Sequence, residues 1–195
     1  MQEILVFDDF IPVRYQNEIE TVMLSENNAT AWFLQEDISY SKTRTDVKKE
    51  KSAIGFSHVF FNERGVVSNL YNFLLPMIYS ALEKGNYDLQ TVVFARSFLQ
   101  IPKNKSTPNN PHVDVEFPHL VCLYYVNDSD GDTIIYNERI NDIEKTNLHL
   151  ENLSIFKTVT PKKGRVVLFN GEQYHSSSCP TTGLRCTINF DLLIK

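Results

Sequence analysis

The sequence predicts an α+β fold that is mainly β, in which two helices precede a core of short strands. Before residue 90, apolar residues recur at helical spacing in two segments. After residue 90, short apolar runs alternate with turn-forming residues, which is typical of a sandwich or barrel. A length of 195 residues with 42% hydrophobic residues suits one domain with a substantial core. We therefore expect a single domain over residues 1–195, with a helical support region that also holds short strands at 1–90 and the main β core at 91–195.

The N-terminal region is expected to contain one short strand and two helices. Residues 4–7 form the apolar run of the strand, and helical spacing begins at Tyr15. The second helix is indicated by an apolar stripe over residues 66–82, and the Gly-Asn pair at 85–86 supplies its end. Pro76 lies inside this stripe and predicts a kink or a break, because proline removes one backbone donor of the helix.

Strands dominate the sequence after residue 90. Clusters of Asn, Asp, Gly, Pro and Lys separate the apolar runs and supply the turns between them. From this alternation we expect strands at residues 91–101, 120–126, 133–136, 155–159, 165–169, 173–176 and 184–194.

A polar segment at residues 35–52 separates the two expected helices. It is too long for a tight turn, and such segments are either functional lids or disordered. It also contains a local cluster of positive charge in a chain whose net charge is −5. A solvated loop explains this cluster better than a nucleic-acid site does, because acidic residues dilute it and the whole chain is acidic. The basic residues are Lys42, Arg44, Lys48, Lys49 and Lys51.

Cysteine usage and hydropathy bear on the compartment. The three cysteines lack paired spacing, which favours buried thiols in a reducing environment over a disulfide framework. The N-terminal residues lack the basic and apolar regions of a signal peptide, and no apolar run approaches the roughly 18 residues of a membrane span. We expect a cytoplasmic protein that does not engage a membrane.

Three residues carry the clearest chemical signal: His112, Asp114 and His175. Residues two apart on an extended segment share one face, so His112 and Asp114 would present an imidazole and a carboxylate together. A second histidine from a distant strand would complete two nitrogens and one oxygen, which is the ligand pattern of non-heme Fe(II) oxygenases. The His-x-Asp triplet alone is weak, because about 0.3 copies are expected by chance in a chain of this composition.

The last expected strand alternates between polar and apolar residues. Arg185, Thr187, Asn189 and Asp191 share one face, and the intervening positions are all apolar. We expect the apolar face to pack against the helices and the polar face to line a cavity. A buried Arg185 would then need a carboxylate, because an unpaired buried guanidinium is costly. Asp191 or the carboxylate of a ligand could supply it, and a surface ion pair at a strand edge is the alternative that needs no cavity.

From about residue 92 to residue 193 the sequence resembles the Fe(II)/2-oxoglutarate-dependent dioxygenases, most closely their prolyl-4-hydroxylase-like branch. The order and spacing of short motifs carry the resemblance, and V-F-D-D-F-I-P at 6–12 adds a weaker match. Two positions depart from the pattern: Asp130 stands where the family often has a glycine, and Gln100 or a neighbour stands where many relatives have a tyrosine. The motifs are P-H-V-D at 111–114, L-Y-Y-V-N-D at 123–128, G-D-T at 131–133, G-R-V-V-L-F-N at 164–170, Y-H at 174–175 and G-L-R-C-T at 183–187.

The resemblance implies a double-stranded β-helix (jelly-roll) core with the N-terminal helices packed on the larger sheet. It implies that the two histidines and the aspartate ligate Fe(II) and are catalytic. Arg185 would bind the distal carboxylate of the co-substrate 2-oxoglutarate, with Thr187 as a hydroxyl partner. Tyr125 would contact the same co-substrate, although ordinary strand packing explains this tyrosine equally well, and Tyr124 would point the opposite way. Ascorbate is expected as an accessory cofactor beside Fe(II) and 2-oxoglutarate.

The implied reaction is hydroxylation of a C–H bond by dioxygen, with conversion of 2-oxoglutarate to succinate and CO2. The branch suggests a peptide or protein substrate, including a prolyl one, and a small molecule fits almost as well because fold does not determine substrate. Nucleic acid is a weaker third choice that depends on the basic cluster in residues 35–52. The alternatives to this enzyme class are a jelly-roll metal enzyme of cupin type that does not use 2-oxoglutarate, and a binding module without chemistry.

Overall fold

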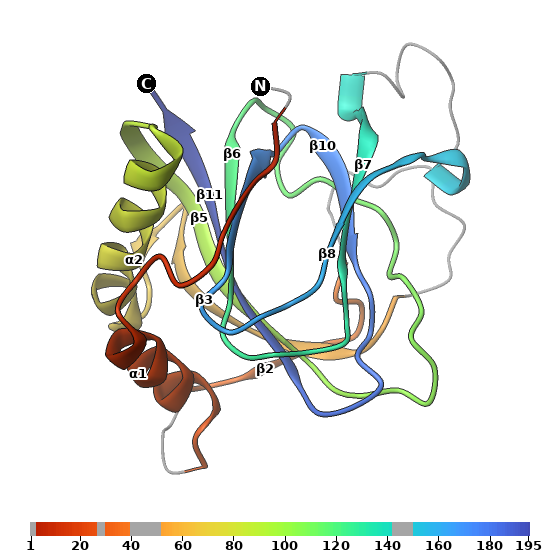
Figure 1. The fold of residues 1–195 in the computed structure, drawn as a ribbon, viewed down its shortest axis with the longest axis horizontal. Coiled ribbons are helices and arrows are strands. Elements are labelled where there is room, and N and C mark those ends of the chain that lie inside the picture. The colour runs from red at the N-terminus through yellow and green to blue at the C-terminus, as the bar shows by residue number, and fades with distance from the viewer. Residues whose placement is uncertain (1–2, 27–29, 40–51, 142–149) are drawn as a thin grey trace.

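The structure is a computed structural model that describes residues 3–26, 30–39, 52–141 and 150–195 (Figure 1). Two α-helices and eleven strands are assigned among these residues, together with a short 3-10 helix. In chain order they are β1 (Leu5–Phe7), α1 (Val13–Leu24), β2 (Phe33–Gln35), β3 (Gly55–Asn62), β4 (Gly65–Val66), α2 (Leu70–Gly85), β5 (Leu89–Gln100), β6 (Leu120–Tyr125), β7 (Thr133–Arg139), η1 (Leu150–Asn152), β8 (Ile155–Val159), β9 (Val166–Asn170), β10 (Gln173–Ser177) and β11 (Arg185–Ile194).

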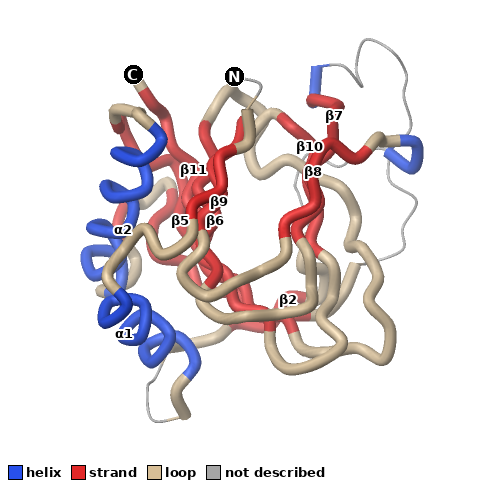
Figure 2. Tube along the Cα trace, in the orientation of Figure 1, coloured by secondary structure: helices blue, strands red, loops and turns tan. Residues whose placement is uncertain are grey.

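The strands form two antiparallel sheets. The large sheet has the order β1-β9-β6-β11-β5-β3-β2, with β4 paired to β3, and the small sheet has the order β10-β7-β8. The two sheets face each other, and both helices lie on the outer side of the large sheet (Figures 1 and 2). The predicted mainly β fold, a jelly-roll core with the N-terminal helices on the larger sheet, is therefore confirmed.

The alternation along β11 explains how the helices attach to the large sheet. The apolar residues Cys186, Ile188, Phe190 and Leu192 are buried in one cluster with the apolar faces of α1 and α2. Removal of this apolar surface from water is the main force that holds the helices there. The polar residues between them are also buried but lie on the other face, so the strand presents polar groups to the space between the sheets.

The helix α2 continues through Pro76, so of the predicted kink or break, the break does not occur. Proline removes the donor for the carbonyl of Asn72, and both residues lie on the exposed side of the helix, where water can satisfy that carbonyl. The helix ends as expected, with Asn86 in the left-handed conformation at φ 57°. Val66, the first residue of the predicted stripe, lies instead in β4 and pairs with Phe61.

Every strand predicted after residue 90 is present, with ends that differ from the prediction by at most three residues. The strand β3 was not placed individually, yet it is 8 residues long and pairs with β5 inside the large sheet. The predicted basic cluster of residues 42–51 lies outside the described residues. Within the described ranges, no helix has both the length and the apolar character needed to cross a membrane.

An ion pair connects the end of β1 to the turn before β9, and it provides a test of the fold. Asp8 accepts hydrogen bonds from Arg165 (Nε–Oδ1 2.7 Å) and Lys162 (Nζ–Oδ2 3.2 Å). The bond from Arg165 is the largest influence on the carboxyl and helps lower the pKa of Asp8 from its usual 3.8 to about 2. We expect Asp8→Asn to lower the free energy of unfolding at neutral pH by less than about 1 kcal/mol, because the pair is partly exposed.

The pH dependence of this effect has a defined sign. A carboxyl whose pKa is depressed by folding stabilises the protein above its unfolded pKa and loses that contribution as the pH falls through its folded pKa. The difference between wild type and Asp8→Asn should therefore shrink as the pH falls from 3.8 to about 2. Urea denaturation at several pH values measures it, with Asp88→Asn as an exposed control. A difference that does not change with pH would contradict this assignment.

Candidate metal and co-substrate site

The two histidines of the predicted triad are brought together by backbone pairing. His112 lies in the connection between β5 and β6, and His175 lies in β10. They form an isolated antiparallel bridge, with His112 N to His175 O at 3.0 Å and His175 N to His112 O at 2.9 Å. Directly opposed residues place their side chains on one face, and the two ring centroids are 4.6 Å apart. A cross-strand pair, rather than a regular strand through 112–114, therefore builds the site.

The three side chains converge on one point. Their ligand atoms all lie within 4.8 Å of one another, with His175 Nε2 at 3.4 Å and His112 Nε2 at 3.9 Å from the carboxylate of Asp114. In each ring the other nitrogen meets a backbone carbonyl: His112 Nδ1 donates to Asn110 O at 3.1 Å and His175 Nδ1 to Gln173 O at 3.2 Å. With the proton on Nδ1, both Nε2 lone pairs face Asp114.

The electrostatics of the triad suit metal binding. Burial, together with the neighbouring His175, lowers the pKa of His112 to about 4, so this imidazole is neutral at neutral pH. Burial by itself would raise the pKa of Asp114, but the Arg96 guanidinium and His175 hold it well below its usual range. Two imidazoles and one ionised carboxylate are the donor set that suits a divalent transition metal with open coordination positions.

The carboxylate of Asp114 is held by donors from two neighbouring strands of the large sheet. Arg96 on β5 forms a hydrogen-bonded ion pair with Oδ1, and Asn189 on β11 donates to Oδ2 at 3.1 Å. Sequence reasoning placed Asn189 on the polar face but missed Arg96. The available signal was the alternation of Arg96 with Phe94 and Phe98 on β5, which puts one cation on the cavity side of an otherwise aromatic stretch.

A second buried carboxyl group, that of Asp191, lies close to Asp114. Asn189 Nδ2 also donates to Asp191 at 3.2 Å, and His119 Nε2 lies 3.8 Å from the same carboxylate. Burial and the charge of Asp114 raise the pKa of Asp191 well above its usual value. The backbone of Gly171 passes so closely that a Cβ there would lie 2.0 Å from His119 Nε2. Asp191 is therefore engaged next to the triad and is not a partner for Arg185.

Arg185 is buried at the other end of the same cavity, with 4% of its surface exposed. Nε donates to Gly131 O at 2.7 Å, Nη1 to Gln100 Oε1 at 3.1 Å and Nη2 to Thr133 Oγ1 at 2.8 Å. No carboxylate in the described part of the chain forms an ion pair with it. A guanidinium has five N–H groups, so one remains on each terminal nitrogen. Two free donors on a fixed fork suit a bidentate carboxylate.

Of the two residues expected to bind the co-substrate with Arg185, Thr187 lines the cavity and Tyr125 does not. Thr187 lies two positions along β11 and lines the cavity. Tyr125 packs its ring 5.8 Å from the Arg185 guanidinium and donates its hydroxyl to Thr133 at 2.7 Å, but it is not among the residues that line the cavity. Tyr124 points the opposite way, into the core under the helices. Tyr125 therefore contacts both Arg185 and Thr133, which line this end of the cavity.

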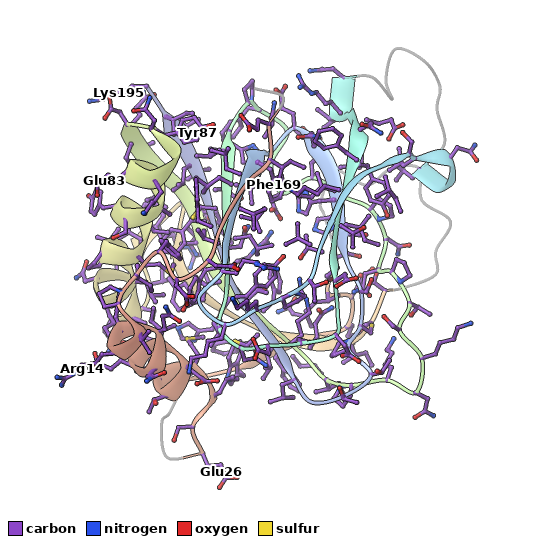
Figure 3. The ribbon with its side chains drawn as sticks, viewed as in Figure 1. Arg14, Glu26, Glu83, Tyr87, Phe169 and Lys195 are labelled. Carbon is purple, nitrogen blue, oxygen red and sulfur yellow. The ribbon has the colours of Figure 1, made fainter. Side chains whose placement is uncertain are left out.

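The cavity lies between the two sheets and joins these two ends. Arg185, Thr187 and Asn189 follow one wall along β11, and the four residue steps from Arg185 to Asn189 span about 13 Å between their Cα atoms. Beside β11 in the same sheet, Val121 and Leu123 of β6 and Phe169 of β9 supply an apolar part of the lining. Phe169 lies in the interior of the molecule (Figure 3), and its ring is 5.2 Å from that of His175. An elongated dicarboxylate fits this arrangement, with one end at Arg185 and the other at the triad.

Comparison with known proteins identifies the fold. No protein-family model and no curated protein matches the sequence. Among solved structures, a Trichoplax adhaerens prolyl hydroxylase in complex with a hypoxia inducible factor peptide fragment is similar, with a TM-score of 0.62, 15% identity and coverage of 99% of this chain and 84% of that chain. The non-heme alpha ketoglutarate dependent carbocyclase SnoK gives a TM-score of 0.67 at 12% identity, covering 100% and 80%. A Pseudomonas putida prolyl-4-hydroxylase gives 0.57 at 12%, covering 98% and 93%. At these identities the likeness establishes the shared fold.

Proposed function

We propose that the chain is an Fe(II)/2-oxoglutarate-dependent dioxygenase that hydroxylates a C–H bond of its substrate. One observation carries this proposal: a single cavity holds a two-histidine, one-carboxylate cluster at one end and, at the other, the buried Arg185 without a carboxylate partner among the described residues. The first end suits a divalent metal and the second suits a carboxylate. The similar solved structures include a prolyl hydroxylase and an alpha ketoglutarate dependent carbocyclase.

The residues of this chain would act at the metal end by binding and orientation. His112, Asp114 and His175 would hold Fe(II), and the backbone carbonyls at Nδ1 keep both imidazoles in the tautomer that binds metal. Iron bound there would supply open coordination positions and redox chemistry for the activation of dioxygen. The apolar side chains of Val121 and Leu123 exclude water from the cavity beside it.

At the other end, Arg185 would bind the distal carboxylate of 2-oxoglutarate. Its position does not depend on the ligand, because Gly131, Gln100 and Thr133 already fix three of its N–H groups. This preorganisation lowers the entropy cost of binding. Thr187, two residues further along the strand, is placed to add a hydroxyl contact. For the complete reaction, the substrate C–H bond, dioxygen and 2-oxoglutarate would give the hydroxylated product, succinate and CO2.

The substrate is proposed only by class. One of the similar structures is a prolyl hydroxylase in complex with a peptide fragment, and SnoK comes from nogalamycin biosynthesis. A peptidyl substrate, including a prolyl one, and a small molecule are therefore both proposed for this chain. A cupin-type metal enzyme that does not use 2-oxoglutarate is the competing assignment, and Arg185 discriminates between the two.

Turnover of the co-substrate without a primary substrate tests the proposal. With Fe(II) and ascorbate, 2-oxoglutarate and O2 should give succinate, CO2 and water, with ascorbate supplying two electrons and two protons. We expect slow succinate formation that requires Fe(II) and 2-oxoglutarate and that disappears in Asp114→Ala. A panel of peptides, amino acids and small molecules is then screened for faster turnover. Absence of succinate under all of these conditions would overturn the assignment.

A further inference from the structure

Arg96 occupies a position that the proposed chemistry leaves unexplained. It lies on β5 opposite Asn189 of β11, on the same strand face as the cavity residues Phe98 and Gln100. Its Nη2 donates to Asp114 Oδ1, while Asn189 donates to Oδ2 at 3.1 Å. Each oxygen of the carboxylate therefore has a donor from the large sheet, and one of the two donors carries a full positive charge.

The sheet holds this cation in place by packing. The rings of Phe94 and Phe98 lie on either side of Arg96 along the strand, at 5.1 Å and 4.8 Å from its Cζ. Contacts of this kind attract a guanidinium to an aromatic face. The Nε of Arg96 is buried and has no hydrogen-bond partner among the described residues. The guanidinium is therefore positioned by two aromatic rings and by Asp114 itself.

A charged donor has two consequences for a metal bound at the triad. It orients the carboxylate, as the neutral donors beside metal ligands do. It also places a like charge close to a divalent cation, in a partly buried site where charges are weakly screened. Imidazoles that bind a metal contribute no charge and Asp114 carries one negative charge, so metal and arginine together would leave excess positive charge at this end. The dianion 2-oxoglutarate would offset it.

We propose that Arg96 is a positioning residue that orients Asp114 for the metal and that, through its charge, makes tight metal binding depend on 2-oxoglutarate. This rests on the proposed function, because it assumes that 2-oxoglutarate shares the cavity with the metal. The role follows from the side chains of this chain, in which an arginine lies between two phenylalanines. A neutral donor at the same place would be sufficient to orient the metal-binding carboxylate.

Metal affinity tests this without relying on turnover. Co(II) binding is titrated by its visible absorption, without O2, in the absence and presence of saturating 2-oxoglutarate. We expect 2-oxoglutarate to tighten Co(II) binding strongly in the wild type. In Arg96→Gln, which keeps a donor but loses the charge, Co(II) without 2-oxoglutarate should bind about tenfold tighter, and the tightening by 2-oxoglutarate should fall by the same factor. Arg96→Lys, which keeps the charge, should resemble the wild type in this coupling.

A second comparison isolates the orienting role. Arg96→Met removes both donor and charge, so it should bind Co(II) about tenfold more weakly than Arg96→Gln does. Arg64→Gln, at an exposed arginine in the turn between β3 and β4, serves as the matched control and should leave both affinities unchanged.

The outcomes separate this inference from the proposed function. Wild-type Co(II) affinity and coupling in Arg96→Gln would overturn the role of the charge, and equal affinities in Arg96→Gln and Arg96→Met would overturn the orienting role. Either result leaves the proposed function intact if the wild type still couples Co(II) to 2-oxoglutarate and releases succinate. If the wild type neither couples Co(II) binding to 2-oxoglutarate nor releases succinate, the proposed function is overturned, and the inference with it.

Discussion

Arg185→Ala is expected to raise the KM for 2-oxoglutarate by about 100-fold to 1,000-fold, because truncating one member of a buried, hydrogen-bonded charge pair costs roughly 3 to 4 kcal/mol. The guanidinium is buried and already fixed by three hydrogen bonds, so a bound carboxylate would meet a preformed fork. Succinate formation measured against 2-oxoglutarate concentration gives the KM directly. Because Arg185 lies at the far end of the cavity from the triad, Co(II) affinity without 2-oxoglutarate should stay within about twofold of wild type.

Two further variants sharpen this result. Arg185→Lys keeps the charge but not the planar fork, so its KM should lie between those of wild type and Arg185→Ala. Arg165→Ala removes an arginine whose partner is Asp8, outside the cavity, and should leave the KM for 2-oxoglutarate unchanged. If metal-dependent activity survived Arg185→Ala without any change in co-substrate use, the assignment of 2-oxoglutarate would be wrong and a cupin-type enzyme would be favoured.

The strand β11 shows how much of the site the sequence can predict. Side chains repeat every two residues along a strand, so the alternation from Arg185 to Leu192 determines which residues face the helices and which face the cavity once the strand itself is recognised. The same local periodicity predicted the helices and most strands. The length of β3 was harder to predict, because its polar and apolar residues do not alternate regularly between Gly55 and Asn62.

Contacts between distant segments cannot be predicted from local sequence patterns. The backbone bridge of His112 with His175 joins residues 63 positions apart, and no local pattern specifies their pairing. The ion pair of Arg96 with Asp114 likewise depends on which strands are neighbours in the large sheet. Strand order is a property of the whole topology, whereas alternation is a property of a few residues. The resemblance of the motifs supplied the expected ligands but not the residues that hold them.

His175→Ala is expected to produce the largest loss, because it removes one of three proposed metal ligands. We expect Co(II) affinity to fall by more than about 100-fold, beyond the effect of removing a residue that only supports a ligand, and Fe(II)-dependent succinate formation to disappear. The fold should persist, since the bridge to His112 uses the backbone N and O of both residues rather than the imidazole. Loss of the contact with the Phe169 ring should lower the free energy of unfolding by only about 1 kcal/mol.

Comparison with another histidine makes this result specific. His58 lies on β3, where its ring bonds Ala31 O and Ser68 Oγ at 2.8 Å each and takes no part in the cavity lining. His58→Gln should therefore alter stability without altering Co(II) affinity, whereas the main effect of His175→Ala should be the loss of Co(II) affinity. Co(II) titration and urea denaturation of both variants separate the two effects. Retention of wild-type Co(II) affinity in His175→Ala would remove His175 from the ligand set and leave Asp114 and His112 without the third donor that the proposed iron site requires.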